Sequence, residues 1–173
     1  MAPVVAQFPA PWSRSLSLVT AASVAVLLIM MLLGLFLSGR APPPWGAAIA
    51  AVPLAVLLAA PPFMVRGYVL TDEHIEIRRL GWRTRLPLAG LVAVTGEPEG
   101  LRGSVRLFGN GGLFAITGWF WNRRIGRFRA YATDPERVVL LRYRDGRQVV
   151  VTPHDVQHFI VRVRALVKVR GES

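Results

Sequence analysis

The stretch GYVLTDEHIEIRRLGWRTRLPL, residues 67–88, decides the fold of the larger part of this chain of 173 residues. Apolar and polar residues alternate along it, and turn-forming residues interrupt the alternation at Asp72-Glu73 and at Gly81. Alternation with a period of two is typical of a strand that buries one face. The stretch therefore predicts three consecutive antiparallel strands, over residues 68–70, 74–79 and 82–88.

Further strands follow around two glycine-containing turns, Asn110-Gly111 and Asp145-Gly146. Such pairs favour a type I′ hairpin turn, because both central residues of that turn need a positive φ. RFRAYAT, residues 127–133, alternates as a half-buried strand with Phe128 on its buried side. The additional strands are expected at residues 91–95, 104–108, 113–117, 127–133, 138–143 and 148–152.

The period changes near residue 152, where a helix is expected. Thr152-Pro153 predicts an N-cap followed by proline at the first helical position, and Asp155 suits the first turn. Apolar residues then recur at helical spacing. They are Phe159, Ile160, Val163, Leu166 and Val167.

Two apolar runs precede the β-rich segment, over residues 16–37 and 45–65, and neither contains a charged residue. About 20 apolar residues are needed for a helix to cross the hydrocarbon core of a bilayer. We therefore expect a two-helix transmembrane hairpin over residues 16–65, with Pro61 and Pro62 kinking or ending its second helix. A cleaved signal peptide is the less favoured interpretation of the first run, because the apolar core of a signal peptide spans only about 7–15 residues and this run is longer.

The basic residues that flank the two runs predict the orientation of the hairpin. The loop between the runs contains only Arg40, whereas Arg66 and four further arginines lie within the twenty residues after the second run. Because cytoplasmic flanks are enriched in basic residues, both termini are expected in the cytoplasm. The protein is thus expected as a multi-pass protein of the inner (cytoplasmic) membrane, with residues 1–15 as a cytoplasmic tail.

The quoted strands resemble a known family in several places. GYVLTDEHIEIRR, WRTRLPL, RLFGNGGLFAITGWFWNRRIGRFRAYATDPERVVLLRY and VVVTPHDVQHFI are similar to the bacterial PH-like (pleckstrin-homology-like) domain of small membrane proteins, over residues 67–167. The resemblance implies a mainly β fold, with residues 67–170 as a PH-like antiparallel barrel or sandwich capped by the C-terminal helix. It also implies membrane attachment, and it supplies no catalytic residues.

Charge and composition restrict the partners. Nineteen of the 21 basic residues and all ten acidic residues lie at or beyond Arg66, so the β-rich segment is strongly basic. An anionic inner leaflet attracts such a domain. Nucleic acid is not expected, because the arginines are scattered along strands and no helix-turn-helix pattern is present. The chain contains no cysteine, which excludes disulfides and thiol chemistry.

Two groups of residues are candidates for contact with lipid headgroups or the membrane. Arg79, Arg83 and Arg85 are spaced similarly to the basic residues with which some PH domains grip phosphoinositides, although a solvated face is the plainer reading. The second group combines aromatic and basic side chains, a combination that is expected where a protein contacts a membrane interface. In the alternative interpretation, its aromatic side chains close one end of the barrel. The second group consists of Trp119, Trp121, Arg123, Arg124 and Arg127.

His154 and His158 lie one helical turn apart, as in zinc-peptidase helices. However, Asp155 stands where such helices carry Glu, and no third ligand is evident, so a solvated helix start is expected instead. No metal, no cofactor and no enzyme activity are expected, and a metal-dependent hydrolase ranks last among the functions considered.

The leading expectation is a non-catalytic, membrane-anchored PH-like module that recruits an unknown protein partner. Its exposed edge or its basic face would serve as the interaction or scaffold surface. The alternative is lipid-headgroup recognition or membrane sensing by the same basic face. Small residues near the start of the second run, which are Gly46, Ala47, Ala50 and Ala51, are also compatible with a homo-oligomer.

Overall fold

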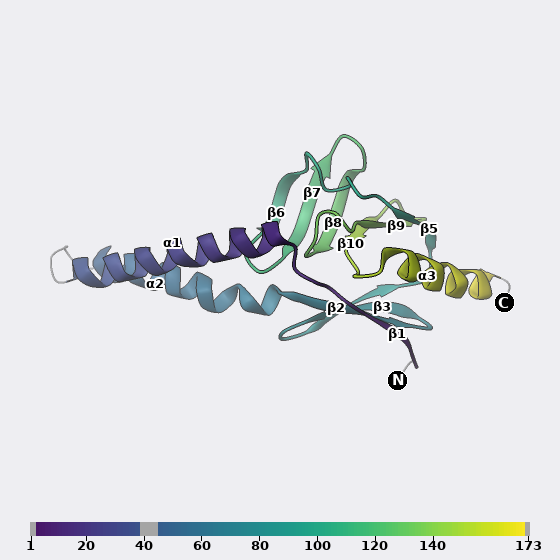
Figure 1. Cartoon of the computed structure of the whole chain (residues 1–173), viewed down its shortest axis with the longest axis horizontal. Helices are drawn as coiled ribbons and strands as arrows, with labels where there is room; N and C mark the ends of the chain where they lie inside the picture. Colours follow the sequence, from purple (N-terminus) through teal and green to yellow (C-terminus); the bar gives the residue numbers. More distant parts are fainter. Residues whose placement is uncertain (1–2, 39–44, 172–173) are drawn as a thin grey trace.

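The computed structural model describes residues 3–38 and 45–171 and arranges them as a pair of helices joined to a β domain that a third helix covers (Figure 1). The strands of the described residues form two sheets, one of four strands and one of six.

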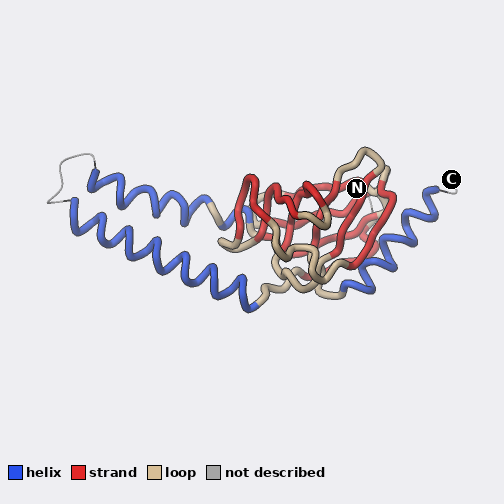
Figure 2. Tube along the Cα trace, turned by 90° about the horizontal axis from the view of Figure 1, so that it is seen from above, coloured by secondary structure: helices blue, strands red, loops and turns tan. Residues whose placement is uncertain are grey.

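Two apolar helices project together from one end of the β domain (Figure 2). α1 spans Arg14–Ser38, α2 spans Trp45–Ala59, and the short 3-10 helix η1 follows at Pro61–Phe63. The helices lie side by side, and a Cβ atom added at Gly34 would come within 2.5 Å of the backbone nitrogen of Ala50. The close approach of the two helices therefore depends on a glycine at this position.

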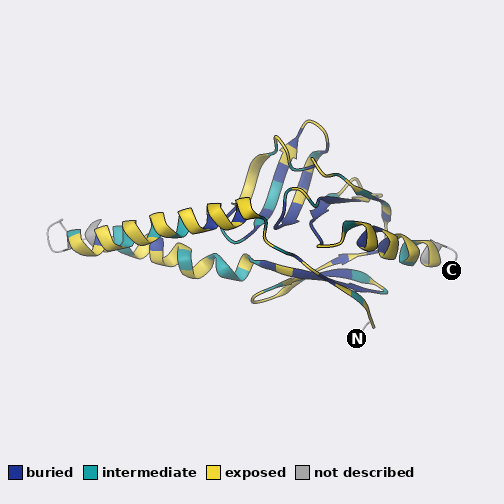
Figure 3. Ribbon diagram, in the orientation of Figure 1, coloured by how far each residue is buried: buried dark blue, intermediate teal, exposed yellow. Residues whose placement is uncertain are grey.

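Within the described residues, only α1 is long and apolar enough to cross a membrane, over Arg14–Leu37. Much of α1 is exposed, and its exposed side chains are mainly apolar (Figure 3). The run Ala47–Phe63 is apolar but shorter, because the proline pair ends the regular α-helix, as predicted. By helix length alone, a second crossing over residues 45–65 is not confirmed.

The smaller sheet has the strand order β1-β2-β3-β4. Its first strand was not predicted, since residues 1–15 were expected as a tail. β1 pairs antiparallel with β2 up to Pro9↔Gly67, and Phe8 is buried in the core. A Cβ atom at Gly67 would lie 2.9 Å from the carbonyl oxygen of Phe8, so glycine permits this pairing. The strands are β1 (Val4–Pro9), β2 (Val65–Thr71), β3 (His74–Arg79) and β4 (Arg83–Pro87).

The larger sheet has the strand order β5-β9-β10-β8-β7-β6, in which β10 and β8 are parallel and the other pairs antiparallel. Each strand predicted for this sheet has a counterpart, but the one predicted at residues 113–117 is largely wrong. Residues 112–115 belong to the β6–β7 loop, where Phe114 has a positive φ, and β7 begins only at Ile116. The strands are β5 (Leu91–Gly96), β6 (Val105–Gly111), β7 (Ile116–Asn122), β8 (Gly126–Ala132), β9 (Val139–Tyr143) and β10 (Gln148–Val151).

Of the two expected arrangements, barrel or sandwich, the barrel is wrong, because the two sheets form separate layers. β4 and β5 are consecutive in sequence but belong to different sheets. The C-terminal helix α3, Val156–Gly171, lies beside β5, and the ring of Phe159 contacts that of Phe8 on β1 at 5.1 Å between centroids. The helix thus fills the space between β1 and β5, and the strands on this side do not meet.

The β6–β7 hairpin is confirmed, but its predicted type I′ turn at Asn110-Gly111 is wrong. Neither residue has a positive φ, and Gly111 still pairs with Ile116. The side-chain oxygen of Asn110 instead accepts the backbone N–H groups of Gly112 and Leu113, so the turn lies further along the chain. In the β9–β10 hairpin, only Gly146 has a positive φ, so this turn is not type I′ either.

α3 is confirmed with its predicted apolar stripe, in which Phe159, Ile160 and Val163 are buried. Its predicted N-cap is wrong. The carboxylate of Asp155 accepts the N–H of His158 and so caps the helix. Thr152 lies before the helix, where its hydroxyl accepts the backbone N–H of Thr133.

Tyr68 on β2 joins the smaller sheet to the larger one. Its side chain is fully buried, and its hydroxyl donates to the carbonyl oxygen of Tyr131 on β8 at 2.6 Å. The same hydroxyl oxygen accepts the N–H of Thr152 at 3.0 Å. One phenol group therefore satisfies buried backbone atoms from two segments of the larger sheet.

Candidate functional site

The inner face of the β7–β8 hairpin carries alternating arginine and aromatic side chains. The register pairs Trp119 with Arg129 and Thr117 with Tyr131, and paired residues share one face of an antiparallel sheet. Phe128 lies on the opposite face, in a second apolar cluster of the larger sheet. The predicted two-sided pattern of β8 is thereby confirmed.

These side chains stack in a row that we call the arginine–aromatic ladder. The guanidinium carbon of Arg127 lies 4.6 Å from the ring centroid of Trp119, and that of Arg129 lies 5.9 Å from the same ring. Arg129 and Arg79 lie 5.2 Å and 5.0 Å from the ring centroid of Tyr131. The guanidinium carbon of Arg79 also lies 5.5 Å from the ring centroid of Trp82. In order, the ladder consists of Arg127, Trp119, Arg129, Tyr131, Arg79 and Trp82.

The ladder borders a groove of about 360 Å³ between β3 and the β6–β8 strands. Phe63, Phe108 and Trp119 supply apolar walls, whereas Arg79 and Arg129 supply charge. Phe63 ends η1, the short helix after α2, and contacts Trp82 edge to face, with 5.0 Å between ring centroids. The groove therefore opens beside the end of the helix pair.

The arginines of the ladder lack acidic partners. Among the described residues, Arg79, Arg127 and Arg129 form no ion pair. Burial lowers the pKa of Arg79, and the nearby charge of Arg129 lowers it further. Burial also raises the pKa of Tyr131, against the opposing effect of both guanidinium groups. The groove thus brings positively charged guanidinium groups together in a partly desolvated environment.

Two polar atoms in this groove have no hydrogen-bond partner among the described residues. They are the Nε atom of Arg79 and the hydroxyl of Tyr131, which are buried beneath the groove that these two residues line. A buried polar group without a partner costs about 1–3 kcal/mol. Two residues that line the groove therefore carry polar groups whose hydrogen-bonding capacity is unused.

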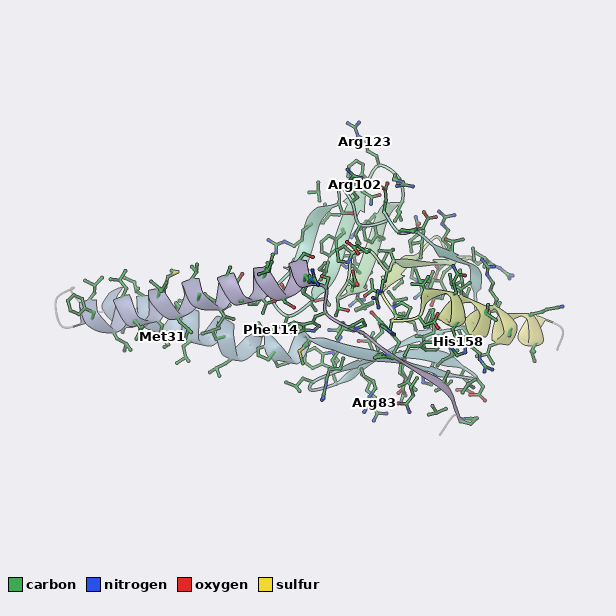
Figure 4. All side chains as sticks on the ribbon, viewed as in Figure 1. Met31, Arg83, Arg102, Phe114, Arg123 and His158 are labelled. Atoms are coloured by element: carbon green, nitrogen blue, oxygen red, sulfur yellow. The ribbon has the colours of Figure 1, made fainter. Side chains whose placement is uncertain are left out.

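The structure separates the predicted trio of Arg79, Arg83 and Arg85. Arg83 and Arg85 lie on the outer face of the smaller sheet, where they bond the carboxylate of Glu76 at 3.3 Å and 3.1 Å. Figure 4 shows Arg83 on this outer side, whereas Arg79 points inward to the ladder. The hydrogen bond from His74 and those from the arginines lower the pKa of Glu76. Two of the three predicted charges are thus already matched by a carboxylate.

The second predicted group is also divided. Trp119 and Arg127 lie in the ladder, and Trp121, which is exposed on β7, pairs with Arg127 and so lies on the same face of the sheet. Arg123 and Arg124 lie in the β7–β8 turn, and Figure 4 shows Arg123 away from the helix pair. Arg124 bonds the carboxylate of Glu99 at 3.0 Å. This turn therefore does not form one surface with the ladder.

Aromatic side chains surround the junction between the helix pair and the β domain. Trp12, just before α1, lies 6.2 Å from Phe114 between ring centroids, and Figure 4 places Phe114 beside the helices. The hydroxyl of Thr20 on α1 bonds the backbone of Gly112 and Phe114, which fixes the β6–β7 loop to the helix. We call the aromatic set the junction rim: Trp12, Phe63, Trp82, Phe108 and Phe114.

The two histidines do not come together with further ligands. His154 contacts the guanidinium of Arg137, and the Nε2 atom of His158 accepts from Arg162 at 3.1 Å. Within the part of the chain that the structure describes, no group of three or more His, Asp or Glu residues could hold a metal ion.

Sequence reasoning missed Arg129, Tyr131 and Phe63. The alternation in RFRAYAT does place Arg127, Arg129 and Tyr131 on one face of the strand. Arg129 and Tyr131 could therefore have been predicted as candidates together with Arg127. Phe63 carried no such signal, because its place beside Trp82 depends on the path of the chain after α2.

The fold and the site define a two-layer β domain, closed by a C-terminal helix, with a basic and aromatic groove and an attached pair of apolar helices. A family model described as a bacterial PH domain matches residues 66–167, more than half of the chain. The chain therefore belongs to the bacterial PH domain family, as its sequence resemblance predicts. No curated protein and no solved structure matches it.

Proposed function

We propose that the chain is a non-catalytic PH module, anchored in the cytoplasmic membrane, which holds an interaction surface against the inner leaflet. Membership of the PH family supports an interaction role, since PH domains are generally not enzymes. The apolar, exposed surface of α1 supports the anchor.

The pairing of β1 with β2 is the observation that carries the anchoring topology. β1 precedes α1 and β2 follows α2, yet Pro9 pairs with Gly67 in one sheet. The chain must therefore return to the side from which it left, so the number of membrane crossings is even. If α1 crosses, the run Ala47–Phe63 crosses back. Its 17 residues are somewhat short for a core of about 30 Å, which local bilayer thinning accommodates.

Two further features favour a cytoplasmic β domain lying on the bilayer. Arginines are concentrated after the second apolar run, and basic flanks remain in the cytoplasm. The junction rim places Trp and Phe side chains where the helices leave the β domain, and aromatic residues prefer the headgroup level.

Cysteine labelling tests this topology, because the chain has no cysteine of its own. We expect Ser38→Cys, at the far end of α1, to react with a membrane-impermeant thiol reagent in intact cells. We expect Ala89→Cys, in the exposed β4–β5 connection, to react only after the cells are lysed. The measurement is the labelled fraction of each variant before and after lysis.

The unaltered, cysteine-free chain is the control for background labelling. Equal reactivity of both variants in intact cells would contradict the proposal, and so would release of the protein from membranes by alkaline carbonate.

The outer strand of the larger sheet supports protein recruitment as a second candidate function. Among the described residues, β6 has a partner strand on one side only, and Val105, Leu107 and Phe108 are all exposed on it. An extended segment of another protein could pair with such an edge.

Site-specific crosslinking tests this candidate function. A photoreactive residue at Leu107 is expected to capture one reproducible protein in cells, whereas one at Val161, exposed on α3, should not. Identical products at both positions, or none at Leu107, would contradict recruitment through β6.

A further inference from the structure

We propose that the groove beside the arginine–aromatic ladder binds the phosphate group of an anionic phospholipid through Arg79, Arg129 and Tyr131. This inference rests on the proposed function, because a bilayer lipid reaches the groove only if the β domain lies on the membrane. It differs from the predicted headgroup site, since Arg83 and Arg85 take no part.

Unmatched charge is the first reason to expect an anion. Arg79 and Arg129 both stack against the ring of Tyr131, at 5.0 Å and 5.2 Å, and neither forms an ion pair within the described residues. Other arginines of the domain, such as Arg83 and Arg124, do bond carboxylates. An anion between two guanidinium groups would relieve their mutual repulsion, and a phosphate fits their planar forks well.

Unused polar atoms are the second reason. The Nε atom of Arg79 and the hydroxyl of Tyr131 are buried without a hydrogen-bond partner among the described residues. Both can donate to a phosphate oxygen. A bound phosphate would therefore satisfy groups that are otherwise desolvated at a cost.

The apolar walls of the groove favour a lipid over a soluble phosphate compound. Phe63, Phe108 and Trp119 line the groove beside the charged groups, and the side chain of Phe108 is 77% exposed. Phe63 is the last residue of the apolar run Ala47–Phe63, so the apolar side of the groove adjoins the proposed anchor. A phospholipid has the matching order of a charged phosphate followed by apolar chains. The volume of about 360 Å³ falls within the usual range for small-ligand sites.

Lipid retention by the purified full-length chain tests the proposal. The protein is transferred to mixed micelles of detergent, phosphatidylglycerol and phosphatidylcholine, and its bound lipids are measured by native mass spectrometry. The unaltered protein should retain phosphatidylglycerol in preference to phosphatidylcholine. The double variant Arg79→Gln/Arg129→Gln should reduce this retention about tenfold or more, because it removes two charge-assisted contacts.

The double variant Arg83→Gln/Arg85→Gln is the matched control. It removes the same number of charges, but on the outer face of the smaller sheet, and should retain phosphatidylglycerol within about twofold of the unaltered protein. Tyr131→Phe keeps the ring and removes only the hydroxyl, and a several-fold loss is expected from it. This variant and the single variant Arg129→Gln, at an exposed position, decide the question if the Arg79 double variant does not fold.

Added inorganic phosphate separates a lipid site from a site for free phosphate. We expect phosphate to displace little phosphatidylglycerol, because it lacks the apolar part that the aromatic walls contact. Full displacement would overturn the lipid assignment in favour of free phosphate. Equal loss in both double variants, no loss in either, or equal retention of both lipids would overturn the site. If the labelling pattern holds while lipid selectivity is absent, only this inference fails, and the anchored module stands.

Discussion

Phe159→Ala is expected to lower the free energy of unfolding of the β domain by about 3–5 kcal/mol, the usual cost of removing a buried phenyl ring. Phe159 on α3 is fully buried, and its ring lies 5.1 Å from that of Phe8 and 6.3 Å from that of Tyr68, between centroids. The substitution leaves a cavity where α3, β1 and β2 meet. It therefore weakens both the helix that covers the sheets and the strand that precedes α1.

Urea unfolding of the full chain in detergent, followed by the β signal in circular dichroism, measures this loss. Val161→Ala is the control, because Val161 is exposed on the same helix and should change stability by no more than about 0.5 kcal/mol. Similar losses in both variants would show that α3 does not pack on the core through Phe159.

Tyr68→Phe is expected to cost about 1–3 kcal/mol near neutral pH, because the carbonyl of Tyr131 and the N–H of Thr152 then lose a buried partner. The ring and its packing against Phe159 are retained. The loss of stability therefore measures the hydrogen bonds that join the two sheets, separately from the apolar packing of the ring.

The same substitution changes the alkaline pH dependence of stability. Burial raises the pKa of Tyr68 from its usual value near 10 to about 12. A raised folded-state pKa stabilises the fold below the unfolded-state value, and this contribution disappears as the pH rises from about 10 to about 12, at about 1.4 kcal/mol per pKa unit. Tyr68→Phe should consequently show a shallower loss of stability over this range.

Tyr143→Phe serves as the comparison for the pH effect. The pKa of Tyr143 is also raised to about 12 by burial, but its hydroxyl has no hydrogen-bond partner among the described residues. We expect this variant to flatten the alkaline slope without the loss near neutral pH. If Tyr68→Phe keeps the full slope of the unaltered protein, the buried phenol is not the group that titrates.

Much of the fold could be predicted from local patterns. Alternation located most of the strands from His74–Arg79 to Gln148–Val151, although β7, at Ile116–Asn122, was predicted too early in the chain. The spacing of the buried apolar residues located α3. Turn types were less accessible, because the side chain of Asn110 bonds the following loop instead of adopting a positive φ. β1 was missed because a short segment beside an apolar run gives no strong period, and its partner β2 lies far away in the sequence.

The candidate site was only partly visible in the sequence. Arg79, Trp119 and Arg127 were among the predicted contact residues and all three lie in the ladder, but the prediction grouped them with their neighbours in the chain. Two residues that are close in sequence, such as Arg79 and Arg83, point to opposite faces of the smaller sheet. Sequence spacing therefore could not distinguish the arginines that form ion pairs with carboxylates from those that do not.

The sequence by itself determined the two apolar runs, the strands, the C-terminal helix and the strongly basic composition, since these depend on residues that are near one another in the chain. Only the tertiary structure decided that the sheets stay open, that β1 returns the chain to β2, and that Arg79 joins Arg129 on the ring of Tyr131. These features depend on contacts between distant segments, and such contacts are fixed by how the two sheets and α3 share one core.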